Sequence, residues 1–186
     1  MALPTSYLTS VKNLKDILEA MQAAQAPKKF TVAFLQGLGF HGTADRLVLA
    51  VLKALGFLGP SGEPTPRYFA FLDQSQSARV LAEGIEEAYA DLFQVNKKAY
   101  ELSATEIKNK LKTLTQGQFS ESVLDKMAGT FKALSAQADF SGPSKAKALD
   151  EKANDTVPIA EPKPLPETRS GTLRLCVLVF NIQIDL

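Results

Sequence analysis

Apolar residues recur at helical spacing through most of the first 140 positions of the chain. In the first of these stretches, Leu14, Ile17 and Leu18 fall on one side. Side chains three and four residues apart share a helix face, so each stretch predicts an amphipathic helix. The stretches with this spacing are 14–26, 31–38, 43–55, 65–72, 77–93, 103–114 and 120–134. The pattern therefore predicts a mainly α-helical protein, with one long helix over 77–93.

Several helix ends carry recognisable signals. The tripeptide Leu-Gly-Phe occurs at 38–40 and again at 55–57, where the glycine favours the left-handed residue of a Schellman motif. Ser103 and Glu106 have the spacing of a capping box, and Asn13 stands where an N-cap is expected. These signals predict where the helices begin and end.

Residues 58–64, Leu-Gly-Pro-Ser-Gly-Glu-Pro, are rich in turn formers and follow the third predicted helix. Such a stretch favours a small hairpin between two extended edges. This hairpin is a candidate wing, and we expect it to form one unit over 1–72 with the three short helices that precede it. A second helical unit, packed on the first, is expected over 73–140.

Beyond residue 140 the composition changes. Residues 141–171 are rich in Pro, Lys, Ala, Glu and Ser with few large apolar groups, which predicts a disordered linker. Residues 172–186 are rich in Leu, Val, Phe and Ile, and Asn181–Ile184 alternates as a strand does. This isolated strand docks on the helical body, pairs between molecules, or begins a C-terminal module that this chain does not complete.

Charge and composition exclude several classes of function. The 21 Lys and Arg against 20 Asp and Glu leave a net charge of +1, so no overall field draws the chain to nucleic acid or an anionic membrane. One cysteine excludes an internal disulfide, and with one histidine the usual zinc sites cannot form. Because no secretory signal or membrane span is evident, we expect a cytoplasmic protein. We do not expect the protein to be an enzyme, and we expect it to bind no metal, cofactor or small-molecule substrate.

The chain resembles DUF5343, an uncharacterised prokaryotic family, over residues 1 to about 140. The residues that carry this resemblance are Phe30-Thr31, Phe34-Leu35, Leu38-Gly39-Phe40, Asp45-Arg46, the run Leu52 to Leu58, Pro64-Thr65, Arg67-Tyr68, Ala82, Gly84-Ile85, Tyr89, Leu92-Phe93 and Met127 to Phe131. The resemblance implies a winged-helix-like N-terminal half. It carries over no catalytic residue and no substrate.

The third helix of a winged helix-turn-helix usually enters the major groove of DNA. At 100° per residue, Arg46, Leu49, Ala50 and Lys53 face outward from the predicted helix over 43–55. Arg46 could contact guanine or phosphate, Lys53 phosphate, and Leu49 a thymine methyl group. The alternative is an ordinary solvated face, because two cations make a weak basic footprint.

Residues 97–132 are the most basic stretch, with seven Lys against four Glu and Asp, an excess of 7 − 4 = +3. Lys108 and Lys112 share a helix face and repel each other unless an anion or an acidic partner lies between them. We expect them to support binding to a nucleic-acid backbone, although lysines on helices are usually only solubilising.

The sequence thus favours a cytoplasmic nucleic-acid-binding or regulatory module, with DNA as the expected partner. The alternative is a protein-interaction module, either with another protein or as a homodimer, without nucleic-acid binding. The outward Leu49 and Ala50 and the near-neutral charge favour this alternative.

Overall fold

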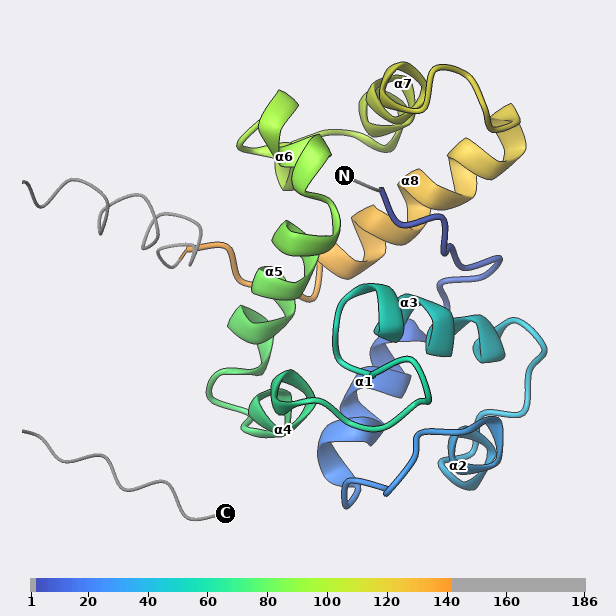
Figure 1. Cartoon of the computed structure of the whole chain (residues 1–186), viewed down its shortest axis with the longest axis vertical. Coiled ribbons are helices and arrows are strands. Elements are labelled where there is room, and N and C mark those ends of the chain that lie inside the picture. The colour runs from blue at the N-terminus through green and yellow to red at the C-terminus, as the bar shows by residue number, and fades with distance from the viewer. Residues whose placement is uncertain (1–2, 142–186) are drawn as a thin grey trace, which may run out of the picture.

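The computed structural model describes residues 3–141, and all regular structure in this range is helical (Figure 1). The elements are α1 (Leu14–Ala23), α2 (Val32–Gly37), the 3₁₀ turn η1 (Asp45–Leu47), α3 (Val48–Ala54), α4 (Pro66–Leu72), α5 (Ser77–Ala88), α6 (Ala90–Val95), the 3₁₀ turn η2 (Ala99–Glu101), α7 (Ala104–Leu114) and α8 (Glu121–Ser135). The predicted helical class is confirmed. The linker and the strand expected beyond residue 141 lie outside the described residues.

The helices form two groups that share one core. In Figure 1, α1 to α4 occupy the lower part and α6 to α8 the upper part, with α5 running between them. Buried side chains from both groups form one continuous hydrophobic cluster. The Leu8 backbone N–H donates to Thr130 Oγ1 of α8 at 2.8 Å, and Asp139 N–H donates to the Ala78 carbonyl of α5 at 2.9 Å. The expected division into two units at residue 72 stays a prediction.

Both Leu-Gly-Phe stops adopt the predicted geometry. Gly39 has φ +96° and Gly56 has φ +74°, values that L side chains rarely adopt. After α3, the Phe57 N–H donates to the Leu52 carbonyl at 2.9 Å, which is the long bond of a Schellman motif. The same pattern follows α2. These stops turn the chain sharply and bury Phe57 beneath the end of α3.

The predicted N-terminal caps have different outcomes. Ser103 and Glu106 form both bonds of the expected capping box at the start of α7. Asn13 occupies the N-cap position of α1, but its side chain makes no capping bond. Its amide nitrogen instead donates to Asp45 Oδ1 at 3.1 Å, because the start of α1 lies against the turn before α3. Asn13 therefore stands at the predicted N-cap position, but its side chain joins α1 to η1 instead of capping α1.

The prediction of one long helix over 77–93 is wrong, because the helix breaks at Tyr89. This residue has φ −106° and ψ +30°, and it separates α5 from α6. The Tyr89 side chain is 2% exposed, and its ring centroid lies 4.9 Å from that of Phe131 in α8. Apolar spacing continues on both sides of the break, so periodicity alone gives no sign of it.

The expected hairpin over 58–64 is reduced to a loop in the described structure. One antiparallel bridge joins Leu58 and Pro64, and no strand extends from it within residues 3–141. Inside the loop, the Gly59 N–H donates to the Glu63 carbonyl at 2.8 Å. On the other side of the bridge the Thr65 N–H donates to the Phe57 carbonyl at 3.0 Å, and Thr65 is already the N-cap of α4, so the pairing ends there. The predicted wing is therefore absent from this part of the chain.

Tyr68 of α4 provides a test of the core. Its side chain is fully buried, its hydroxyl has no hydrogen-bond partner within the described residues, and burial raises its pKa to about 12. Because an unpaired buried hydroxyl is unfavourable, Tyr68→Phe should leave the free energy of unfolding unchanged or raise it by about 1 kcal/mol. Urea denaturation measures the change. A loss of more than about 1.5 kcal/mol would show that the hydroxyl is hydrogen-bonded, for example to a buried water.

Candidate nucleic-acid interface

The exposed side of η1 and α3 is a narrow stripe. Arg46, Ala50 and Lys53 are exposed, and their spacing of four and three residues places them on one face. Leu49 was expected to point outward, but it is half-buried and packs against the core. The stripe therefore has a cation at each end and a small side chain between them.

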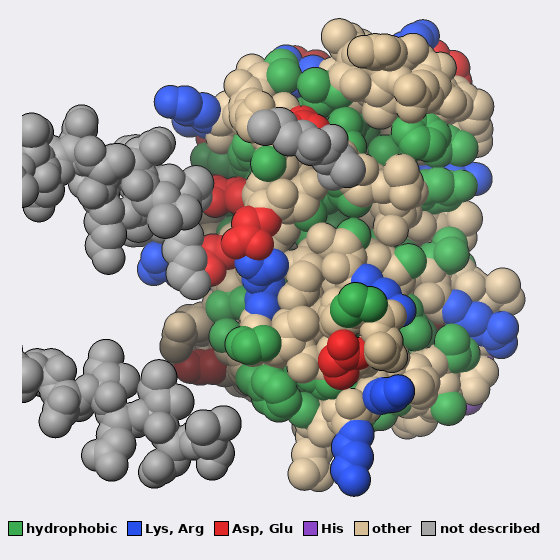
Figure 2. Space-filling model, viewed as in Figure 1, with side chains coloured by type: hydrophobic (Ala, Val, Ile, Leu, Met, Phe, Trp, Pro, Cys, Tyr) green, Lys and Arg blue, Asp and Glu red, His purple; other side chains and the backbone are tan. Residues whose placement is uncertain are grey.

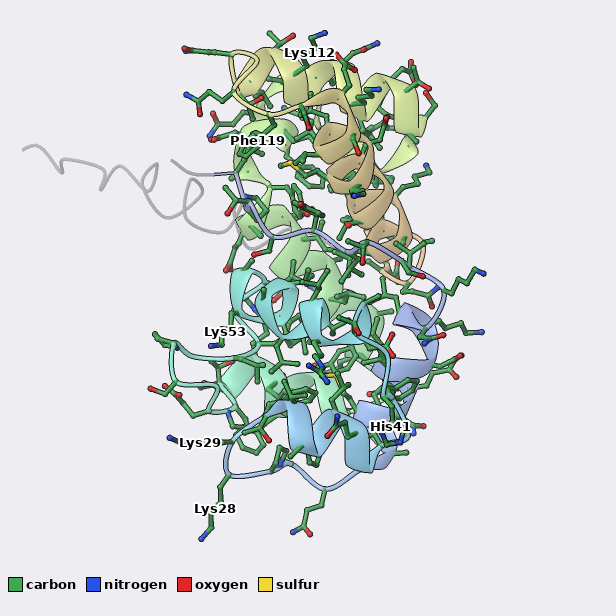
Figure 3. All side chains as sticks on the ribbon, turned by 90° about the vertical axis from the view of Figure 1, so that its right-hand side faces the viewer. Lys28, Lys29, His41, Lys53, Lys112 and Phe119 are labelled. Carbon is green, nitrogen blue, oxygen red and sulfur yellow. The ribbon has the colours of Figure 1, made fainter. Side chains whose placement is uncertain are left out.

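Two lysines from another part of the chain lie beside this stripe. Lys53 Nζ donates to the carbonyl of Pro60 at 2.8 Å, and Phe30 N–H donates to the carbonyl of Gly62 at 2.7 Å. The loop over 58–64 thus holds both the end of α3 and the segment before α2. Lys28 and Lys29, just before Phe30, are both exposed. Figure 3 shows them along the same edge of the molecule as Lys53.

We call Lys28, Lys29, Arg46 and Lys53 the α3 basic edge. Arg46 and Lys53 were predicted from the helical pattern, whereas Lys28 and Lys29 were missed. They lie in the connection between α1 and α2, where no periodicity applies. Only the hydrogen bond from the next residue to the loop brings them near the end of α3. The sequence signal for these two residues is a pair of adjacent lysines between two helices, which is weak evidence for a binding site.

Carboxylates are scarce around the α3 basic edge. Residues 24–62 contain these four cations and one acid, Asp45, an excess of 4 − 1 = +3. Asp45 is 8% exposed and accepts hydrogen bonds from the Asn13 amide and from the Gly42 N–H at 3.0 Å. Glu63, at the rim of the loop, is exposed. Lys28, Lys29 and Arg46 form no ion pair within the described residues.

Acidic residues gather elsewhere. Residues 80–96 contain four of them, Glu83, Glu86, Glu87 and Asp91, and no Lys or Arg. Figure 2 shows red side chains over α5 at the left with blue side chains beside them, and several blue side chains over the lower right with a red group among them. The two signs are therefore unevenly distributed but mixed on this face. A net charge of +1 is consistent with a local basic surface.

Lys108 and Lys112 lie in a different environment. Lys108 Nζ lies 2.9 Å from Glu121 Oε2 and 2.8 Å from Asp125 Oδ1, and Lys112 Nζ lies 2.5 Å from Glu121 Oε1. The acidic partner that these lysines require comes from α8 of the same chain. Figure 3 shows Lys112 at the opposite end of the molecule from Lys28, Lys29 and Lys53. The two groups of lysines cannot form one compact surface.

This ion-pair cluster makes stability depend on pH. Hydrogen bonds from Lys112 and Lys108 lower the pKa of Glu121 from 4.5 to about 2. A carboxyl whose pKa is depressed by folding stabilises the folded state above its unfolded pKa, and this contribution disappears as the pH falls toward the folded value. We expect Glu121→Gln to be less stable than the wild type at pH 6. The difference should shrink between about pH 4.5 and pH 2.

Urea midpoints of both proteins, measured across that range, give the comparison. Glu63→Gln is the matched control, because Glu63 is exposed and forms no ion pair within the described residues. Its stability difference from the wild type should vary less with pH. An equal pH dependence in the two variants would show that the lysines do not stabilise the Glu121 carboxylate.

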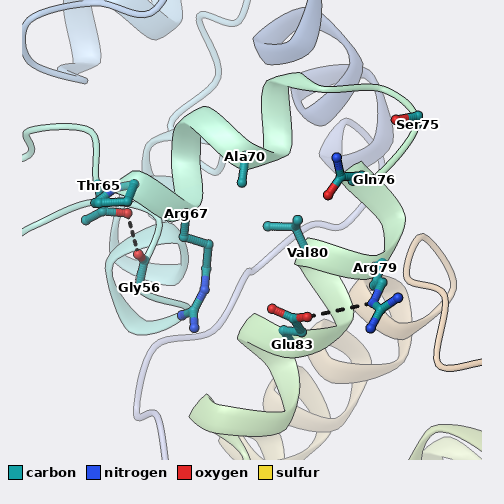
Figure 4. A pocket seen from close by; sticks show the side chains of 10 residues that line it. Gly56, Thr65, Arg67, Ala70, Ser75, Gln76, Arg79, Val80 and Glu83 are labelled. Carbon is teal, nitrogen blue, oxygen red and sulfur yellow. Dashed lines mark hydrogen bonds and ion pairs between the residues drawn. The ribbon is translucent and has the colours of Figure 1, made fainter. Parts of the chain in front are cut away.

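A cleft of about 910 Å³ lies between α4 and α5 (Figure 4). Arg67 on its wall donates from Nη1 to the Leu55 carbonyl at the end of α3, at 2.7 Å, and its Nη2 pairs with Glu87 of α5. A Cβ at Gly56 would lie 2.5 Å from Arg67 Nη1, and one at Gly84 would lie 3.0 Å from the Leu55 carbonyl oxygen. The two glycines therefore leave room for an arginine that joins α3, α4 and α5.

The chemistry of this cleft is that of a structural joint. The second arginine on its wall, Arg79, pairs with Glu83 at 3.8 Å, and Ser75 and Gln76 bond to Asp73. Within residues 3–141 no group of three His, Cys, Asp or Glu residues could hold a metal ion. His41 is exposed, and Figure 3 shows it away from Lys53. The α3 basic edge is therefore the best candidate site.

Among the described residues no helix is both long and apolar enough to cross a membrane.

Comparison with known proteins identifies a family. No curated protein and no solved structure matches the chain significantly. The model of a family of unknown function, DUF5343, matches residues 6–145, which is most of the chain and includes every helix of the described residues. The protein belongs to the DUF5343 family.

Proposed function

We propose that this protein binds duplex DNA through the α3 basic edge, with α3 against the DNA. The observation that carries the proposal is the group of exposed cations around α3 and its loop. Four exposed cations stand against two acids, Asp45, which is buried and bound to other groups, and the exposed Glu63 of the loop. Basic side chains on one face are the usual electrostatic footprint of a protein that contacts phosphates.

The order of elements supports a mode of DNA binding like that of a winged helix. Three helices, α1 to α3, are followed by a loop that one bridge closes, and α4 then begins. The loop takes the place of a wing beside the third helix, and Lys53 bonds to it. In proteins of this type the third helix and the wing contact DNA together. The short loop of this chain would contribute its backbone and the neighbouring lysines instead of a long hairpin.

Lys108 and Lys112 have no part in this proposal. Both are paired with carboxylates of α8, and binding a phosphate there would require exchange of those partners.

The protein-interaction alternative rests on exposed apolar groups, and these are scattered. Val11, Phe69 and Val95 are 40 to 55% exposed and lie on separate elements. Single exposed apolar side chains are normal on a soluble surface.

Fluorescence anisotropy with the full chain tests the proposal. Labelled duplex DNA, single-stranded DNA and duplex RNA are titrated at about 50 and 200 mM salt. We expect saturable binding to duplex DNA that weakens at the higher salt concentration. No binding to duplex DNA at the lower concentration would refute the proposal and favour the protein-interaction alternative. Stronger binding to RNA or to a single strand would refute the choice of duplex DNA.

A further inference from the structure

We infer that the α3 basic edge contacts the phosphates of the DNA backbone and does not recognise base sequence. This inference rests on the proposed function and specifies the kind of DNA recognised. It follows from the side chains that η1 and α3 present. Over residues 44–55 the polar side chains are Asp45, Arg46 and Lys53, and Asp45 is buried. The remaining residues of that stretch are Ala, Val and Leu.

Sequence is read in the major groove by particular side chains. Arg pairs with guanine through two donors, and Asn or Gln pairs with adenine through a donor and an acceptor. No Asn or Gln occurs in residues 44–55, so adenine has no matching side chain on this helix. Leu49 was expected to touch a thymine methyl, but it packs partly against the core. Arg46 and Lys53 are then the side chains of this stretch able to contact a base, in both cases guanine, and Arg46 alone has the two-donor fork.

The other cations are suited to phosphate. Lysine is a point charge without the fixed fork of arginine, so it neutralises a phosphate but selects bases poorly. Lys53 already gives one hydrogen bond to the Pro60 carbonyl, which fixes its ammonium group at the loop. Lys28 and Lys29 lie on the same edge beyond the stripe of α3 (Figure 3). Three of the four charges thus lie along one edge of the molecule (Figure 3).

A competition experiment with the full chain tests the inference. Labelled duplex is displaced by unlabelled duplexes of equal length and unrelated sequence, including AT-rich and GC-rich examples. We expect their affinities to agree within about threefold, because each specific base contact that is lost normally costs more than this. A preference of about tenfold or more for one sequence would overturn the inference. Absence of binding to every duplex would instead refute the proposed function itself.

Arg46→Lys separates the two roles of Arg46. The substitution retains the charge and removes the fork that recognises guanine. If the contact is to phosphate, affinity should change by less than about threefold for every duplex, and the ranking of sequences should not change. Arg46→Ala, in which the charge is lost, should weaken binding to all sequences equally. A loss of discrimination in Arg46→Lys alone would show that Arg46 reads a base, and the inference would be wrong.

Discussion

Replacing all four cations of the α3 basic edge with alanine should weaken binding to duplex DNA by at least about a hundredfold at low salt. The variant is Lys28→Ala, Lys29→Ala, Arg46→Ala and Lys53→Ala. Non-specific affinity comes almost entirely from counterions released when protein cations neutralise phosphates, and this variant removes the clustered cations near α3. All four side chains are exposed, so the helical content should not change. Anisotropy titration measures affinity, and far-UV circular dichroism checks the fold.

A control with the same loss of charge distinguishes a local surface from a general effect. Lys97→Ala, Lys98→Ala, Lys110→Ala and Lys112→Ala also remove four charges, but from the segment before η2 and from α7. These lysines belong to the stretch that the sequence singled out as most basic. We expect less than about a threefold loss of affinity. Equal losses in the two variants would contradict a binding surface at α3.

Phe131→Ala should lower the free energy of unfolding by about 4 kcal/mol. The Phe131 side chain is fully buried at the centre of α8, with its ring centroid 4.9 Å from that of Tyr89 and 6.0 Å from that of Phe93. Truncation removes buried apolar surface and leaves a cavity between α8 and the break from α5 to α6. Such a loss is a large part of the total stability of a typical domain. Urea denaturation measures it.

Phe131→Leu keeps this test interpretable if the alanine variant does not fold. Leucine restores part of the volume, so the loss should be nearer to about 1.5 kcal/mol. A loss below about 1 kcal/mol in the alanine variant would show that the aromatic cluster around Tyr89 contributes little. The break between the two helices would then need another explanation.

Local signals predicted the helices well because each depends on a few adjacent residues. The glycines at 39 and 56 and the capping box at Ser103 act within one turn of helix, and the structure has them as predicted. The break occurs at Tyr89, whose ring contacts Phe131, a residue far away in sequence. The role of Asn13 depends on Asp45, a partner across the fold. These features had no local signal.

The candidate site shows the same division between local and distant information. Arg46 and Lys53 follow from the pattern of α3, because a helical wheel separates exposed from buried positions. The addition of Lys28 and Lys29 requires the hydrogen bond between Phe30 and Gly62. The pairing of Lys108 with α8 requires the packing of α7 on α8. Without those contacts, local charge density alone points to Lys108 and Lys112 and gives no sign of their acidic partners in α8.

The salt dependence of DNA binding measures how many phosphates the α3 basic edge contacts. The logarithm of the binding constant is measured against the logarithm of salt concentration for the wild type and for the variant without the α3 basic edge. Four phosphate contacts predict a wild-type slope of about −3.6. In the variant without the α3 basic edge the slope should approach zero. The control variant, in which Lys97, Lys98, Lys110 and Lys112 are replaced, should keep the slope of the wild type. A slope that the loss of these four cations does not change would contradict the assignment of this surface.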